Sequence, residues 1–142
     1  MLVGAFALIG AGAGLAQTPT APVTIAFVNP GKHDEFFWPA VTAVMQAAAG
    51  QFGFKLEVAY AERDAQAMIE MGQTIIARAD PPDFLVLVNE FQAASQLLPL
   101  ADAKGVKTFM LLNSFYGQQA TEMGRPGERY RNWIGSIVPD NR

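Results

Sequence analysis

The sequence predicts an α/β fold, a three-layer sandwich built on a mainly parallel sheet of the Rossmann-like or flavodoxin-like kind. Two observations predict it: short apolar runs alternate with longer segments of helical period, and the runs are apolar almost throughout. Continuous apolar runs are typical of strands that are buried on both faces, as in parallel sheets. Strands that alternate with helices favour parallel pairing through crossover connections. The expected strands are 23–28, 54–60, 84–88, 106–112 and 133–138.

The segments between these runs have apolar residues at helical spacing, so we expect helices there. In the first, Pro39 is best tolerated where a helix opens, so we expect a helix over residues 38–52, with Phe36 and Phe37 in the preceding loop. In the second, Asp64 is the expected N-cap. Apolar residues then recur at helical spacing and form one face: Ala65, Met68, Ile69, Gly72, Ile75, Ile76 and Ala79.

The third helix is expected to begin near Ser95 or Gln96. Pro99 then lies in the first turn, where its missing N–H leaves no helical hydrogen bond unmade. Residues 93 and 94 would belong to the loop. After the fourth strand, residues 113–132 show no strand pattern and only a brief helical possibility near 118–123.

The composition fits one globular domain. The chain has 142 residues, of which 51% are hydrophobic and 16% charged, so it can bury a core and is not disordered. The net charge of -3 provides no extended basic surface, which excludes nucleic acid as an expected partner. Because the sequence contains no cysteine, it also excludes disulfides, thiolate metal sites, cysteine nucleophiles and a lipid-bearing cysteine.

Residues 1–16 contain no charged side chain and consist almost wholly of small and apolar residues. The run is too short to span a bilayer comfortably and ends in small residues before Gln17, which predicts a signal peptide. An uncleaved anchor or a buried first helix is the alternative. We therefore expect a periplasmic protein with a signal peptide at 1–16, a linker at 17–22 and a folded domain at 23–142.

Polar and aromatic residues gather after the expected strands. Ligands of open parallel sheets bind at the carboxyl ends of the strands. Aromatic faces cover the apolar faces of a sugar ring, while amide and acidic groups pair with its hydroxyls. The predicted ligand-binding residues are Glu35, Phe37, Trp38, Asn89, Glu90 and Asn113.

Each of these residues also has a purely structural interpretation. The aromatic side chains would staple the first helix to the core, and Asn89 and Asn113 would be turn residues. His33, the only histidine, lies beside Asp34 and Glu35, so a metal site or a general base there is a further alternative. The chain has no G-x-S-x-G, Walker A loop or G-x-G-x-x-G after a strand. We therefore expect no enzyme, and no catalytic residue, metal or cofactor.

Three short segments match motifs of a known family in order and spacing. They are residues 35–38 (EFFW), the strand end Val88-Asn89 and the pair Asp140-Asn141. They resemble the polar-Pro-Phe-Phe helix opening, the strand-end Asn and the hinge Asp-Asn of type I periplasmic substrate-binding proteins. The likeness is to the amino-terminal lobe of the ribose-binding and related sugar-binding proteins of ABC transporters. It covers about residues 23–141 and implies that Phe37 and Trp38 enclose a sugar ring.

Two departures from the family pattern leave the ligand open. Ribose-binding relatives carry an Asp-Arg pair where this chain has Asn113-Ser114, and the segment 115–131 is longer than in small sugar-binding proteins. The resemblance also implies a second lobe after Asp140-Asn141, so we expect a truncated lobe with the second lobe absent. Late segments of the full protein would complete this lobe, so we expect exposed apolar surface and self-association.

These observations predict binding of a solute, a sugar or a similar polar metabolite, for ABC-transporter uptake or sensing. The expected protein partner is an ABC transporter permease or a membrane sensor, if a full-length protein exists. One alternative is a protein-interaction module that acts through the 116–131 loop, whose arginines would dock a partner or simply be solvated. The other is a small flavodoxin-like domain that binds a flavin or a nucleotide. The arginines are Arg125, Arg129 and Arg131.

Overall fold

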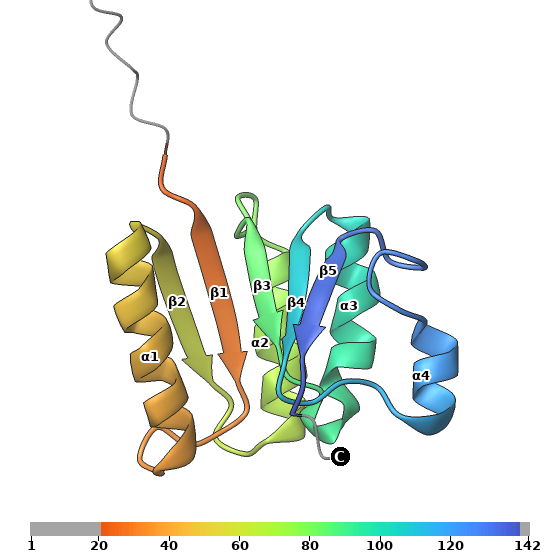
Figure 1. The fold of residues 1–142 in the computed structure, drawn as a ribbon, viewed down its shortest axis with the longest axis horizontal. Helices are drawn as coiled ribbons and strands as arrows, with labels where there is room; N and C mark the ends of the chain where they lie inside the picture. Colours follow the sequence, from red (N-terminus) through yellow and green to blue (C-terminus); the bar gives the residue numbers. More distant parts are fainter. Residues whose placement is uncertain (1–20, 140–142) are drawn as a thin grey trace, which may run out of the picture.

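The computed structural model describes residues 21–139 of the chain. Its strands form one 5-stranded sheet in the order β2-β1-β3-β4-β5, and every pairing is parallel (Figure 1). This confirms the predicted parallel α/β fold, and each strand differs from its expected range by at most one residue at either end. The strands are β1 (Thr24–Asn29), β2 (Lys55–Tyr60), β3 (Phe84–Leu87), β4 (Lys107–Leu111) and β5 (Trp133–Ile137).

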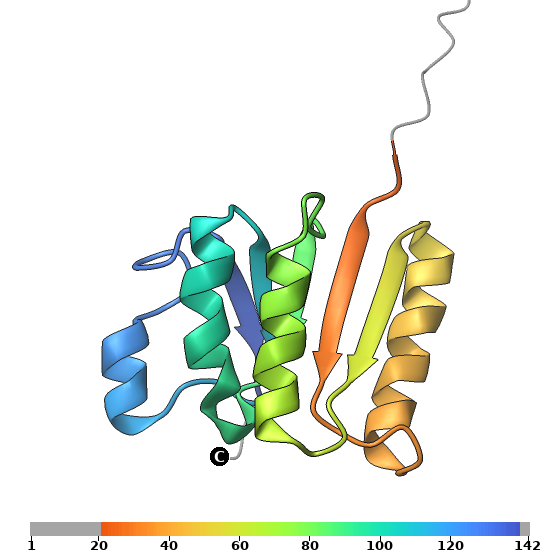
Figure 2. The same ribbon diagram turned by 180° about the vertical axis from the view of Figure 1, so that it is seen from behind.

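Helices cover both faces of the sheet, which gives the three predicted layers. They are α1 (Phe37–Phe52), α2 (Ala65–Ile76), α3 (Ala93–Ala103) and α4 (Gly117–Met123), with a 3-10 turn at Glu90–Gln92 before α3. Figure 2 shows α2 and α3 side by side over one face. Helix α1 packs on the opposite face, where the ring centroids of Phe27 and Trp38 are 6.3 Å apart.

Helix α2 follows its sequence prediction closely. The Asp64 side chain accepts a hydrogen bond from the Ala67 N–H and caps the helix, as expected. Gly72 lies on the buried face, against Leu97 of α3. A Cβ atom at Gly72 would come within 2.4 Å of Leu97 Cδ1, so the close approach of α2 and α3 depends on glycine.

Helix α3 begins at Ala93 rather than near Ser95, so that prediction was wrong. Both Ala93 and Ala94 are fully buried, and Pro99 consequently lies inside the helix. Burial of this first turn against the core outweighs the backbone hydrogen bond that Pro99 cannot donate. Helix α1 likewise begins one residue earlier than expected, at Phe37.

The long segment before β5 is packed against the sheet. Helix α4 confirms the brief helical possibility near 118–123. Phe115 and Met123 are buried, and the Phe115 ring meets the Trp133 ring edge-on with centroids 5.3 Å apart. Arg125, Arg129 and Arg131 are exposed, so partner docking by them stays a prediction.

An apolar groove runs between α1 and the end of β4. It has a volume of about 420 Å³, and its lining includes Val41, Val44, Met45, Leu111 and Leu112. The side chain of Val44 is 71% exposed there. Exposed apolar surface was expected on this domain, and self-association through it stays a prediction.

Some expected features fall outside the described residues. These are the signal peptide at 1–16, most of the linker at 17–22, and the hinge pair Asp140-Asn141. Within residues 21–139, none of the helices has the length and apolar character needed to cross a bilayer.

Candidate ligand-binding site

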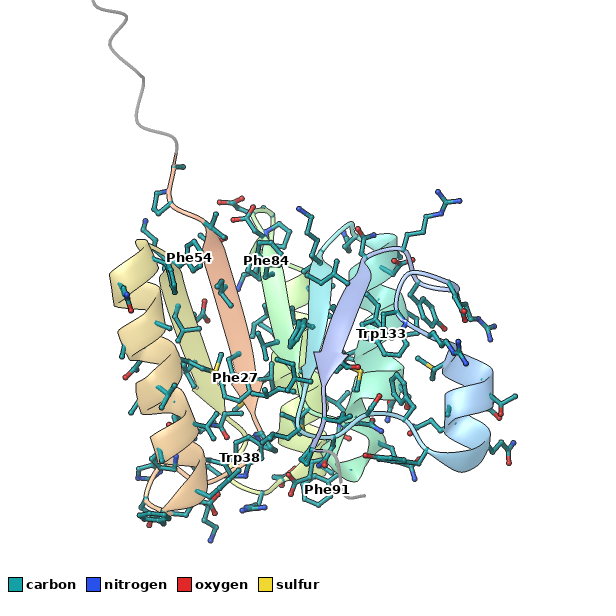
Figure 3. All side chains as sticks on the ribbon, viewed as in Figure 1. Phe27, Trp38, Phe54, Phe84, Phe91 and Trp133 are labelled. Atoms are coloured by element: carbon teal, nitrogen blue, oxygen red, sulfur yellow. The ribbon has the colours of Figure 1, made fainter. Side chains whose placement is uncertain are left out.

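The loops after β1, β2, β3 and β4 lie at one edge of the sheet, the carboxyl edge. Figure 3 shows the side chains of Trp38 and Phe91 at this edge, and those of Phe54 and Phe84 near the opposite one. All predicted site residues belong to the loops after β1, β3 and β4 or to the start of α1, so the fold brings them to the carboxyl edge. They form an aromatic turn (residues 30–38) after β1 and an amide pocket between the loops after β3 and β4.

The aromatic turn is held in place by Asn29, the last residue of β1. Asn29 is fully buried, and its Oδ1 accepts a hydrogen bond from the Gly31 N–H at 2.9 Å. Its Nδ2 donates to Thr42 Oγ1 at 3.0 Å and to the Trp38 carbonyl at 3.4 Å. Sequence reasoning did not single out Asn29 as a site residue. Its position in the sequence could have indicated this role, because a polar residue at the end of a buried strand needs hydrogen-bond partners in the following turn.

The two predicted aromatic residues have different surroundings. The Phe37 side chain is 50% exposed at the carboxyl edge, whereas Trp38 is only 4% exposed. Trp38 packs between Phe27 and Phe37, whose ring centroids lie 6.3 and 5.1 Å from its own. We therefore reassign Trp38 from the ligand to the core, because its side chain is almost wholly buried. Direct ligand contact by Phe37 stays a prediction.

The two predicted acids, Glu35 and Glu90, are joined by Arg63 of the loop after β2. The Arg63 Nη2 donates to Glu35 Oε1 at 2.8 Å and its Nε to Glu35 Oε2 at 3.1 Å, a bidentate pair. The Arg63 Nη1 donates to Glu90 Oε1 at 2.8 Å. Hydrogen bonding to Glu35 raises the pKa of Arg63 above its ordinary value. Sequence reasoning missed Arg63 because it searched the loops after β1, β3 and β4 only.

The amide pocket brings Asn89 and Asn113 together. It is a cavity of about 700 Å³ that also includes Tyr116 and Gln119 in its lining. The Asn89 Nδ2 donates to the Ser114 carbonyl at 3.1 Å and to Gln119 Oε1 at 2.8 Å. The Asn89 Oδ1 is buried and accepts a hydrogen bond from no donor within residues 21–139. The full lining is Asn89, Gln92, Ser95, Asn113, Ser114, Tyr116, Gln118, Gln119 and Glu122.

No family model and no curated protein matches the chain. A solved structure described as a periplasmic sugar-binding protein from Pseudomonas fluorescens does match, with 36% identity and a TM-score of 0.69 over 83% of this chain. The chain matches one lobe of the periplasmic sugar-binding proteins. It spans about a third of that structure, 32% of its length. The resemblance predicted from the sequence is confirmed.

More distant solved structures share the fold of the lobe. A galactofuranose-binding protein is 19% identical, with a TM-score of 0.64 over 84% of this chain and 36% of its own. An ABC transporter solute-binding protein from Mycobacterium smegmatis, solved with bound glycerol, is 23% identical, with a TM-score of 0.59 over 70% of this chain and 34% of its own. At these identities the likeness establishes the fold alone.

Backbone strain in the lobe is concentrated at the carboxyl edge. The non-glycine residues with positive φ among those described are Glu62, Arg63, Phe91, Gln92 and Leu112, with φ between 52° and 65°. All of them lie in the loops after β2, β3 and β4. A left-handed conformation costs such residues roughly 1–2 kcal/mol each. Strain of this kind clusters at binding sites, where the surrounding structure maintains it.

His33 of the aromatic turn pairs with Glu62 rather than with its neighbours in sequence. Its Nδ1 lies 2.9 Å from Glu62 Oε1, which also accepts from the His33 backbone N–H at 3.3 Å. Within the part of the chain that the structure describes, no group of three potential ligands could hold a metal ion. The pairing with Glu62 ties the aromatic turn to the loop after β2.

We expect the pairing of His33 with Glu62 to depend on pH. The hydrogen bond to Glu62, and then the charge of Glu62, raise the pKa of His33. Because the pKa is higher in the folded lobe, the stabilisation is complete below the unfolded-state pKa of about 6.5 and is lost as pH rises through the folded-state pKa. An NMR titration of this sole histidine should give a higher pKa in the native lobe than in urea. Glu62→Gln should remove the difference, and an unchanged His33 pKa in that variant would exclude the pairing.

Proposed function

We propose that the lobe binds an uncharged sugar or a similar polyol at its carboxyl edge, in the periplasm, for ABC-transporter uptake or sensing. The observation that carries this proposal is the amide pocket, which brings Asn89 and Asn113 together at the carboxyl edge. The half-exposed ring of Phe37 lies at the same edge of the sheet, outside the lining of this pocket. The names of the matched structures support it, since they describe proteins that bind a sugar or galactofuranose, and one that was solved with glycerol. These names describe binding proteins, so we propose binding and not catalysis.

The chemistry of the amide pocket suits hydroxyl groups. A hydroxyl both donates and accepts hydrogen bonds, and so does a primary amide. The Asn89 Oδ1 has no donor among the described residues, so it is an acceptor that a ligand hydroxyl could satisfy. The pocket lining contains no lysine, arginine or histidine, and its carboxylate is Glu122. A carboxylate or phosphate on the ligand would therefore lack a charge partner here, which favours a neutral ligand.

One lobe alone should bind its ligand weakly. The site opens at the edge of the sheet, so a bound sugar keeps one side in water and gains only part of the contacts that an enclosed ligand has. We therefore expect dissociation constants on the order of 1 mM for the lobe by itself. A facing lobe that closes over the carboxyl edge, as the family resemblance implies, would raise the affinity.

Titration of the ¹⁵N-labelled chain with neutral sugars tests the proposal. Ribose, galactose, arabinose and glycerol should shift the side-chain amide signals of Asn89 and Asn113, whereas glucuronate should not. Asn113→Ala should weaken sugar binding about tenfold, because it removes one or two hydrogen bonds to the ligand. The control is Gln51→Ala, at the far end of α1 from the site. The proposal fails if no neutral sugar moves these signals, or if both variants bind equally well.

A further inference from the structure

We propose that Arg63 is a positioning residue that sets the Phe37 ring relative to the amide pocket by joining three loops of the carboxyl edge. It lies in the loop after β2 and pairs with Glu35 in the aromatic turn and with Glu90 in the loop after β3. Glu35 is two residues before Phe37, and Glu90 directly follows Asn89. One guanidinium thus connects both halves of the candidate site. This inference rests on the proposed function, whose ligand would contact both halves.

The backbone of Arg63 is held as firmly as its side chain. The Arg63 N–H donates to the Pro30 carbonyl at 3.0 Å, and the Glu62 N–H donates to the Gly31 carbonyl at 3.0 Å. Arg63 also has a left-handed backbone, with a φ of 64°. Such a conformation persists where its surroundings hold it in place. The aromatic turn is therefore attached to the loop after β2 through both main chain and side chains.

The exposure of these ion pairs indicates that they contribute more to geometry than to stability. The side chain of Arg63 is 41% exposed, and those of Glu35 and Glu90 are 23% and 22% exposed. Exposed ion pairs stabilise a fold little, because water screens them and their side chains lose entropy. A bidentate guanidinium pair nevertheless fixes direction as well as distance. Loss of Arg63 should thus change where the two loops lie more than it changes the unfolding of the lobe.

The chain offers a matched control for this inference. Arg78 forms the same kind of bidentate pair with Glu57, with both N–O distances 2.6 Å and side-chain exposures of 38% and 50%. This pair lies beyond the end of α2, next to residues at the start of β1 and β2 and away from the carboxyl edge. Arg78→Gln therefore removes a bidentate pair of the kind that Arg63 makes with Glu35, without touching the candidate site.

The experiment compares Arg63→Gln, Arg63→Lys and Arg78→Gln in the full chain by ¹⁵N NMR, urea unfolding and titration with ribose, galactose, arabinose and glycerol. Arg63→Gln should shift both the Asn89 side-chain amide and the Phe37 backbone amide and weaken sugar binding about tenfold. Arg63→Lys, which can pair with one acid at a time, should bind sugar about threefold more weakly than the parent chain. Arg78→Gln should leave these signals and the affinity unchanged, while the urea midpoints of both glutamine variants move by similar small amounts.

Single substitutions of the two acids test the Arg63–Glu35 and Arg63–Glu90 ion pairs separately. Glu35→Gln should shift the Phe37 signal alone, and Glu90→Gln the Asn89 signal alone. The inference is overturned if Arg63→Gln moves only signals within the Arg63 loop, or if this variant binds sugar as tightly as the parent chain does. Either result leaves the proposed function standing. If the parent chain binds none of the sugars, the proposed function fails, and the paired shifts of Phe37 and Asn89 still decide whether Arg63 joins the loops.

Discussion

Replacing Trp38 with alanine should lower the free energy of unfolding by about 3–5 kcal/mol, the usual cost of removing a large buried aromatic side chain. The Trp38 ring is 4% exposed and touches both Phe27 in β1 and Phe37 in the first turn of α1. Its loss leaves a cavity between α1 and the sheet. Urea unfolding can be followed through the fluorescence of Trp133, the other tryptophan.

The neighbouring substitution Phe37→Ala is the matched control. Its side chain is 50% exposed, so its removal should cost under about 1.5 kcal/mol of stability, less than half the cost at Trp38. It should instead abolish detectable sugar binding, since Phe37 is the predicted stacking face. If Trp38→Ala proves as stable as the parent chain, or Phe37→Ala unfolds more readily than Trp38→Ala, the division of roles between the two rings is wrong.

The sequence was sufficient to predict the parallel sheet and the positions of Asn89 and Asn113 at its carboxyl edge. Apolar runs that alternate with helical periods leave few arrangements other than a parallel sheet. Parallel strands that are neighbours in the sheet end at the same edge, so the residues that follow β3 and β4 must lie close together. Placing these residues at one edge needs no knowledge of side-chain conformation, and ligand binding by them stays a prediction.

The roles of Trp38 and Arg63 could not be predicted in this way. Phe37 and Trp38 are consecutive in a helix, so they point about 100° apart, and which one faces the core depends on where α1 begins. Beside that start, Asn29 makes buried hydrogen bonds with Gly31 and Thr42, and no local pattern specifies these partners. Arg63 pairs with acids 28 and 27 positions away in the sequence, and such pairings depend on loop conformations that no local pattern specifies.

The start of α3 was missed for a related reason. The position of Pro99 favoured a late start, but the fully buried side chains of Ala93 and Ala94 extend the helix by two residues. Tertiary burial overrode a local preference, as it often does for helix ends. The consequence reaches the candidate site, because the strained turn at Phe91 and Gln92 that precedes α3 follows Asn89 and Glu90 directly.

Gly31→Ala should destabilise the lobe by about 1–3 kcal/mol, because it forces an extra methyl group into a filled space. A Cβ atom at Gly31 would lie 2.0 Å from Trp38 Cδ1 and 2.4 Å from Glu35 Oε1. Gly31 is not among the described glycines with positive φ, so the cost is one of space and not of backbone conformation. Trp38 cannot yield easily, since Phe27 and Phe37 pack against its ring.

Two comparisons make this prediction specific to the contact with Trp38. Gly50→Ala, at an exposed position in α1 with nothing within 4 Å of the new Cβ, should instead stabilise the lobe by about 0.5–1 kcal/mol. In a Trp38→Ala background, Gly31→Ala should cost less than in the parent chain, because the Trp38 ring atoms that the new methyl group meets are gone and only the contact with the Glu35 carboxylate remains. Equal costs in both backgrounds, measured by urea unfolding, would mean that the Trp38 ring does not lie over Gly31, and that the aromatic turn has a different conformation.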